Sequence, residues 1–264
     1  MIVVTNNKVA SFQPPLWAEF RGFSFLFDNP GNSFRSNEGV EEIACVSEAE
    51  GGPTLYKRLQ VAISQIGGSR LTNEFLFCPL PPSSYHVTVC DGINADNIGM
   101  VPEGHRADVA AFLRGLPSSL RHMPVSLRSI ISESEMAIRS IGGITFGFHK
   151  LTIWGNKVMV ARLRPVDAES TECLGKLKNA RVALCKRLRE VFGIATSESY
   201  SPHVSLGYFA NSESAKPASD LLAPWTQEFG GTVGTTVISF DSVSLYGFTD
   251  MATFFRLPGA RFPS

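Results

Sequence analysis

The sequence predicts an α+β fold with antiparallel sheets backed by helices. The expected order of elements is strand, helix and further strands, and it repeats in the second half of the 264-residue chain. A short motif of histidine, apolar, hydroxyl and apolar residues also occurs once in each half. We therefore expect one bilobed domain, 1–264, with lobes at about 1–140 and 141–264, a division that leaves room for strands to be exchanged between lobes.

The first half contains strand and helix signals in alternation. Apolar runs or apolar–polar alternation predict strands at Gly22–Phe27, Ser84–Cys90 and Val125–Ile131. Apolar residues at helical spacing predict helices at Thr54–Ile66 and Gly104–Leu116. The cluster Asn29–Asn32 predicts a turn, and the boundary between the halves is expected near Arg139–Gly143.

The second half contains the clearest hairpin signal of the chain. Two strand-like runs, Leu151–Trp154 and Val158–Leu163, flank the turn pair Gly155-Asn156. A long helix is expected from Asp167, which can cap its start, to Gly193, which can end it. Further strands are expected at Ile144–Phe148, Tyr200–Tyr208, Val237–Leu245 and Ala252–Leu257, and a helical segment at Ser212–Phe229.

Composition narrows the class of protein. With 24 Lys plus Arg and 24 Asp plus Glu, the net charge is zero, so any surface that attracts nucleic acid must be local. Five cysteines without CxxC spacing argue against a disulfide framework or a zinc site and suit a reducing compartment. No stretch is long and apolar enough to suggest a signal peptide or a membrane span, so we expect a cytoplasmic protein that does not bind membranes.

The two histidine motifs are the strongest functional signal. They read Tyr85-His86-Val87-Thr88 and Pro202-His203-Val204-Ser205. Residues two apart on a strand project from the same face, so each motif displays an imidazole beside a hydroxyl. One such histidine alone is most simply a hydrogen-bonded core residue, whereas a matched pair points to chemistry.

The chemistry that suits this pair is the cleavage of a phosphodiester. One histidine can remove a proton from the attacking group while the other protonates the departing oxygen. The hydroxyls of Thr88 and Ser205 can donate hydrogen bonds to phosphoryl oxygens, where negative charge builds up. This mechanism requires neither a metal nor a cofactor, and the sequence alone does not assign the base and the acid.

At these residues the sequence resembles the 2H phosphoesterase superfamily, which includes LigT-like RNA ligases and cyclic phosphodiesterases. The resemblance lies in the stretches YSPHVSLGY and LPPSSYHVTV. It implies a bilobed α+β fold in which two antiparallel sheets face a central cleft, with helices on the outside. It also implies that His86 and His203 are catalytic and that Thr88 and Ser205 bind phosphate. The spacing of the motifs exceeds that of small members, and we assign the excess to Asn94–Gly104 and Ser132–Gly143.

Other substrate contacts are expected around the motifs. Arg162, Arg164 and Lys150 on the hairpin strands are candidates for phosphate contacts, and Tyr200 is a candidate for stacking on a base. The basic face of the Asp167–Phe192 helix is interrupted by glutamates, so we interpret it as a solvated surface.

The leading hypothesis is a metal-independent phosphodiesterase that acts on a 2′,3′-cyclic nucleotide or a short RNA. The alternatives are an RNA 3′-end-processing or ligating enzyme with the same residues, and a nucleotide-binding module without turnover. The expected partner is a nucleotide or short RNA substrate, and the sequence identifies no protein partner.

Overall fold

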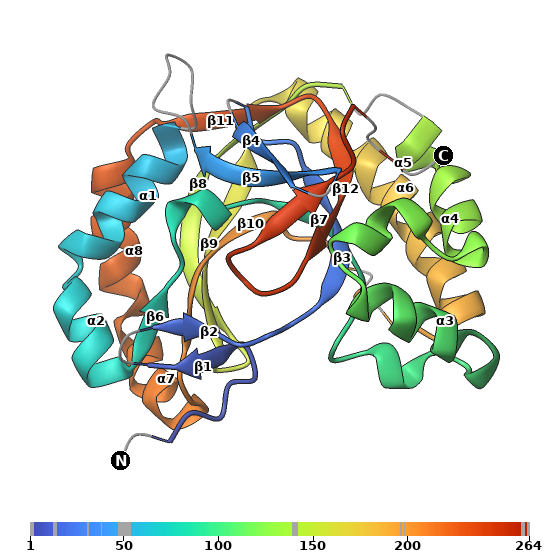
Figure 1. Ribbon diagram of the computed structural model, residues 1–264. Coiled ribbons are helices and arrows are strands. Elements are labelled where there is room, and N and C mark those ends of the chain that lie inside the picture. The colour runs from blue at the N-terminus through green and yellow to red at the C-terminus, as the bar shows by residue number, and fades with distance from the viewer. Residues whose placement is uncertain are drawn as a thin grey trace.

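The α+β fold is confirmed by a computed structural model of the chain, in which helices flank antiparallel sheets on two sides (Figure 1). The structure describes residues 3–12, 15–30, 32–37, 39–46, 54–138, 142–195, 197, 199–259 and 262. The predicted turn at Asn29–Asn32 and the predicted boundary at Arg139–Gly143 include residues 31 and 139–141, which lie outside these ranges.

The larger sheet combines strands from both ends of the chain. Its order is β4 (Asn32–Asn37), β5 (Val40–Val46), β13 (Phe254–Arg256), β12 (Val243–Phe248), β3 (Gly22–Phe27) and β7 (Thr88–Asn94). Each neighbouring pair is antiparallel. The predicted strand Gly22–Phe27 is confirmed as β3, and all six of its residues are buried because both faces of the strand are covered.

The second sheet is built around the predicted hairpin. Its order is β11 (Val237–Phe240), β8 (Ile144–Trp154), β9 (Val158–Pro165), β10 (His203–Phe209) and β6 (Phe77–Pro79), again antiparallel throughout. Gly155 and Asn156 have φ values of 57° and 52°, the left-handed conformation that the turn between β8 and β9 requires. Two short strands, β1 (Val9–Ser11) and β2 (Leu16–Trp17), form a separate small sheet.

The helices gather on two flanks of the sheets (Figure 1). One flank holds α1 (Thr54–Gln65), α2 (Gly68–Phe75), α7 (Ser212–Ala218) and α8 (Leu222–Val233). The other holds α3 (Glu103–Arg114), α4 (Val125–Ser132), α5 (Glu135–Ile138) and α6 (Ala168–Phe192). Short 3₁₀ turns are η1 (Pro82–Ser84), η2 (Ile98–Met100), η3 (Ser118–His122) and η4 (Ser219–Leu221). Within the described ranges, none of the helices combines the length and the apolar character needed to cross a membrane.

The long helix α6 is bounded as the sequence predicts. The Asp167 carboxylate accepts a hydrogen bond from the Ser170 backbone nitrogen at 2.7 Å, which caps the start of the helix. Gly193 ends the helix with a φ of 69°. Leu174, Leu177, Leu184 and Leu188 form an apolar stripe at helical spacing and are buried, so α6 packs against the sheets through this stripe.

The two large sheets meet in a shared aromatic core. The Phe27 ring of β3 lies 4.7 Å from the Phe240 ring of β11 and 5.8 Å from the Phe146 ring of β8, measured between centroids. A backbone bridge also joins Val87 to Val204, the residues that follow the two histidines. The two motifs are therefore neighbours in space, although they lie in opposite halves of the sequence.

The prediction of a strand at Val125–Ile131 is wrong, because this segment forms helix α4. Pro124 precedes the first helical residue, a position that suits proline's fixed φ. The buried residues Leu127, Ile130 and Ile131 have the spacing of one helix face. An apolar segment of this length is ambiguous in sequence, and here packing as a helix decides its structure.

Other predicted boundaries also differ from the structure. The strand expected at Val237–Leu245 is two strands, because Asp241 and Ser242 separate β11 in one sheet from β12 in the other. The segment Ser212–Phe229 is divided into α7, η4 and α8. The strand expected from Ser84 begins at Thr88, since Pro82–Ser84 forms the 3₁₀ turn η1. The strand expected from Tyr200 begins at His203.

Candidate active site

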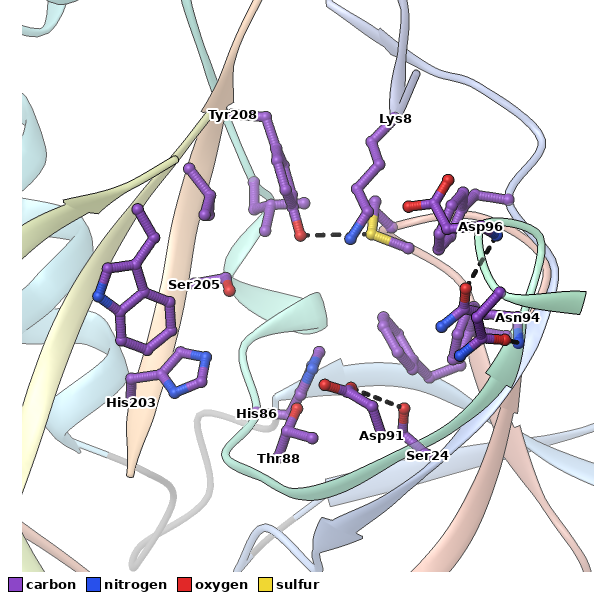
Figure 2. A pocket seen from close by; sticks show the side chains of 18 of the residues that line it. Lys8, Ser24, His86, Thr88, Asp91, Asn94, Asp96, His203, Ser205 and Tyr208 are labelled. Atoms are coloured by element: carbon purple, nitrogen blue, oxygen red, sulfur yellow. Dashed lines mark hydrogen bonds between the residues drawn. The ribbon is translucent and has the colours of Figure 1, made fainter. Parts of the chain in front are cut away.

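A cavity of about 450 Å³ lies between the two large sheets, and both histidine motifs line it. His86, Thr88 and Asp91 belong to β7 or directly precede it, whereas His203, Ser205 and Tyr208 belong to β10. Figure 2 shows the two groups on opposite sides of the cavity. The volume is in the range of small-molecule sites in proteins. The fold therefore brings together all four residues of the two motifs.

His86 is fixed by the turn that precedes β7. Its Nδ1 lies 2.7 Å from the Ser84 carbonyl oxygen of η1, and its ring packs 4.5 Å from the Phe254 ring of β13. The carbonyl of the intervening Tyr85 accepts a hydrogen bond from buried Asn29 at 2.8 Å. The Tyr85 side chain points into the core, as expected for the neighbour of a residue that faces the cavity.

His203 is held in the same way by the segment before β10. Its Nδ1 lies 2.9 Å from the Ser201 carbonyl oxygen, and its ring packs 4.3 Å from the Trp154 ring of β8. A carbonyl oxygen can only accept, so Nδ1 of His203, like that of His86, is the protonated nitrogen that donates. In each neutral ring, Nε2 is therefore the atom with a free lone pair.

Burial makes both histidines weaker bases than free imidazole. It lowers the pKa of His86 from 6.5 to about 4, and positive charge on His203 or Lys8 acts in the same direction. Burial also lowers the pKa of His203, with a further contribution from the Arg162 guanidinium. Both rings are therefore neutral at pH 7 when the cavity holds no anion. A bound phosphate would favour the imidazolium form.

The two motif hydroxyls line the cavity beside the histidines. Thr88 and Ser205 are half-buried. In the described part of the chain, neither hydroxyl has a hydrogen-bond partner, so both can donate to a ligand in the cavity.

Arg181 lies at the cavity wall, although it was not among the site residues predicted from the sequence. It sits on α6 and is only 6% exposed. Its Nε donates to the Val89 carbonyl of β7 at 2.8 Å, and its Nη2 donates to the Ser197 carbonyl at 2.7 Å. A buried charge with these partners ties α6 to the segments that carry both motifs. No sequence signal distinguished this arginine from the other basic residues of the helix.

Lys8 is a second cation that sequence reasoning missed. Its Nζ lies 4.7 Å from the Phe20 ring centroid and 5.2 Å from that of Tyr208, within the range of cation–π contacts. Buried Asn6 anchors the segment through hydrogen bonds to the carbonyls of Phe209 and Lys157, at 2.9 and 3.2 Å. The N-terminal segment therefore contributes a fixed positive charge to the cavity (Figure 2).

Acidic side chains also line this cavity. Asp91 accepts a hydrogen bond from Ser24 at 3.3 Å, and Asp96 accepts one from Asn7 at 2.5 Å. These carboxylates offset the charges of Lys8 and Arg181. The cavity therefore contains both positive and negative side chains around the two neutral histidines.

A second cavity of about 430 Å³ continues past His203. Thr88, Asp91, Arg181 and His203 line both cavities, so the candidate site lies where the two meet. Arg162 lines the second cavity, and its Nε donates to the Ser201 hydroxyl at 2.9 Å. A ligand centred on the two motifs thus has space on both sides.

Of the four additional substrate contacts that the sequence suggested, two line a cavity and two do not. Arg162 and Tyr200 line the second cavity. The Tyr200 hydroxyl donates to the Thr88 carbonyl at 3.0 Å, a structural contact that supports the first motif. Arg164 and Lys150 are exposed and line neither cavity. The structure therefore places only Arg162 and Tyr200 at the cavity walls.

No metal centre is evident in the part of the chain that the structure describes, where no three His, Cys, Asp or Glu side chains form a group that could hold an ion. The other histidines fit ordinary roles: His105 packs 5.2 Å from Phe192, and His122 and His149 are exposed. Cys78, Cys90 and Cys185 are buried thiols, Cys173 is half-buried, and the side chain of Cys45 lies outside the description.

Comparison with known proteins gives distant structural similarities. No family model and no curated protein matches the chain. Similar solved structures include a conserved protein of unknown function from Agrobacterium tumefaciens, 12% identical, with a TM-score of 0.48 over 90% of this chain and 84% of that one. Another is Usb1 from Kluyveromyces marxianus, 9% identical, with a TM-score of 0.41 over 90% of this chain and 97% of that one.

Proposed function

We propose that the protein is a metal-independent phosphodiesterase that acts on a nucleotide or RNA phosphodiester through two-histidine acid–base catalysis. The matched geometry of His86 and His203 carries this proposal. Each ring donates from Nδ1 to the carbonyl two residues earlier, and each lines one cavity beside a motif hydroxyl. Two imidazoles that each keep Nε2 free in one cavity provide the two proton-transfer groups that general base and general acid catalysis at one phosphorus centre requires.

In this mechanism the neutral histidine acts first. Its Nε2 removes the proton from the attacking hydroxyl, either a ribose 2′-OH or water. The other histidine, protonated at Nε2 beside the bound phosphate anion, donates that proton to the departing oxygen. Thr88 and Ser205 donate hydrogen bonds to the non-bridging oxygens as their negative charge increases. The first ring gains one proton and the second ring loses one, so the two rings together hold the same number of protons before and after the step.

The cleaved bond belongs either to a 2′,3′-cyclic phosphate or to a short RNA. A cyclic mononucleotide has one nucleoside and requires only the first cavity, whose volume of about 450 Å³ is in the range of small-molecule sites. A linear diester has groups on both sides of phosphorus, and the second cavity, which begins at His203 and Arg181, favours this second candidate. RNA end processing or ligation with the same residues belongs to this linear class.

A panel assay with chelator present tests the proposal. The substrates are 2′,3′-cyclic nucleotides and short 2′,5′- and 3′,5′-linked oligoribonucleotides, with products resolved by mass spectrometry. We expect cleavage that falls by ~100-fold or more in His86→Ala and in His203→Ala, because each substitution removes one proton-transfer group. His122→Ala is the matched control, since His122 is exposed and lies outside both cavities.

Three results would contradict the mechanism. Full activity in both single variants would remove the assigned roles of the histidines. Strict dependence on added metal would require another mechanism. Stoichiometric binding of a nucleotide that is recovered unchanged would instead identify a binding module.

A further inference from the structure

A row of basic side chains extends from His203 across the second sheet. His203 of β10 pairs directly with Arg162 of β9, and Arg162 pairs directly with Lys150 of β8. Directly paired residues of antiparallel strands project from the same face, and neighbouring strands are about 5 Å apart. The row therefore begins at the candidate active site and leads outward to an exposed lysine.

Arg164 adds a third cation beside this row. It lies two residues from Arg162 on β9 and so projects from the same face. Gly147 is its partner on β8, so no side chain stands opposite it. His149 is the extra residue at the β8 bulge, and desolvation of its ring, with contributions from the nearby positive charges of Arg164, Lys150 and Arg162, lowers its pKa.

These cations lack acidic partners. Across the described residues, no carboxylate is within ion-pair distance of Lys150, Arg162 or Arg164. Like charges in directly paired positions destabilise a sheet, so Lys150 opposite Arg162 has an energetic cost. The lysines of α6 differ, because Lys176 pairs with Glu172 at 2.7 Å and Lys186 with Glu190 at 3.9 Å.

We infer that Arg162, Lys150 and Arg164 bind the phosphates of an oligonucleotide that extends from the scissile phosphate over β9 and β8. An uncompensated row of cations that starts at the site is suited to a chain of regularly spaced anions. This inference rests on the proposed function and narrows its substrate to oligonucleotides longer than a dinucleotide. A cyclic mononucleotide would not reach Lys150 or Arg164.

The test compares substrate length in the wild type and in the double variant Lys150→Met/Arg164→Met. The substrates are a dinucleotide, a tetranucleotide and an octanucleotide of adenylate, in 3′,5′- and 2′,5′-linked forms. In the wild type we expect kcat/KM to rise roughly tenfold from dinucleotide to octanucleotide. In the variant this ratio should fall severalfold toward one, because Lys150 and Arg164 no longer contact phosphates beyond the cleaved bond and only Arg162 remains.

Salt dependence provides a second readout. Each phosphate contact contributes a slope of about −0.7 to the plot of log affinity against log salt concentration for single strands. The double variant should therefore reduce the slope for the octanucleotide by roughly 1.4. The matched control is Lys176→Met/Lys186→Met, which removes the same charge from α6 and should leave both the slope and the length ratio at wild-type values.

The possible results separate this inference from the proposed function. Histidine-dependent cleavage with no gain in rate for longer substrates would overturn the inference and leave the proposed function in place. If no substrate is cleaved, the proposed function fails. Binding of a fluorescent octanucleotide by His86→Ala then still tests the basic row, because an affinity that is unaffected by Lys150→Met/Arg164→Met would overturn it.

Discussion

At the scale of single residues, the two histidines depend on backbone carbonyls for their orientation. The Ser84 and Ser201 carbonyls fix the proton on Nδ1 of each ring, so the tautomer follows from the local backbone and needs no carboxylate. The aromatic rings of Phe254 and Trp154 restrict the rotation of each imidazole and increase its burial. Burial of each ring lowers its pKa, whereas the carbonyl hydrogen bond that orients the ring acts in the opposite direction and raises it.

The lowered pKa values predict an acidic optimum for kcat/KM, which reports on the free enzyme. The general acid must be protonated, and its protonated fraction decreases as the pH rises above its lowered pKa. The general base must be neutral, and its neutral fraction decreases as the pH falls below the pKa of that base. Since both pKa values lie below 6.5, with that of His86 at about 4, we expect the maximum below pH 6.5. A pH–rate profile at low substrate concentration measures it, and a maximum above pH 7 would contradict this prediction.

The hydroxyls of Thr88 and Ser205 allow a second prediction. Thr88→Val and Ser205→Ala each remove one hydrogen bond to a charged phosphoryl oxygen, with little change in shape. We expect kcat to fall roughly ten- to hundredfold in each variant. The thermal midpoint should stay close to that of the wild type, since neither hydroxyl has a partner among the described protein groups. Steady-state kinetics and thermal unfolding check both parts, and unchanged kcat in both variants would remove the hydroxyls from the mechanism.

The residues of the candidate site differ in how far they can be predicted from the sequence. His86, Thr88, His203 and Ser205 are visible because their motif repeats and because strand alternation places each pair on one face. Lys8 and Arg181 carry no such pattern. Lys8 reaches the cavity because Asn6 anchors its segment to carbonyls more than a hundred residues away in sequence. No pattern in the neighbouring sequence predicts a contact of this kind.

At the scale of elements, helix α6 connects the two motifs. Arg181 donates to the Val89 carbonyl, next to Thr88, and to the Ser197 carbonyl in the segment before His203. Its guanidinium also lies 5.4 Å from the Tyr200 ring centroid, and the Tyr200 hydroxyl donates to the Thr88 carbonyl. A single side chain of α6 therefore contacts the supports of both motifs.

This connection predicts a combined effect of Arg181→Met on stability and catalysis. Methionine fills much of the volume but leaves buried carbonyls without their donor, so we expect a loss of about 2 kcal/mol in the free energy of unfolding. We also expect a lower kcat, because both motifs lose a positioning contact. Urea unfolding and kinetics measure the two effects. The exposed Lys178→Met on the same helix is the control, and a stable Arg181→Met with full kcat would contradict the role assigned to Arg181.

Elements with regular periodicity and caps could be predicted from sequence, whereas short apolar segments could not. Helix α6 has an apolar stripe, an Asp167 cap and a terminal Gly193, and all three features indicate the same helix. The segment Val125–Ser132 has eight residues without a side-chain cap, and its helical form depends on packing against α6. The break between β11 and β12 sends consecutive strands to different sheets, a choice that only tertiary contacts determine.

At the scale of the whole molecule, the sheets do not follow the division of the sequence. In the six-stranded sheet, β12 and β13 come from the C-terminal end of the chain and lie between β5 and β3. In the five-stranded sheet, the edge strand β6 comes from the first half. Each sheet therefore needs strands from both halves of the chain to be complete.

This arrangement predicts that the two halves do not fold independently. A fragment of residues 1–140 lacks β12 and β13, so β3 and β5 would have no partner on their inner edges and would expose unpaired backbone groups. A fragment of residues 141–264 would carry these two strands without the rest of their sheet. We expect each fragment alone to lack amide protection in hydrogen exchange, the mixture to recover it, and the intact chain to unfold in one transition. A protected 1–140 fragment, or two transitions in the intact chain, would instead show that the lobes are independent folding units.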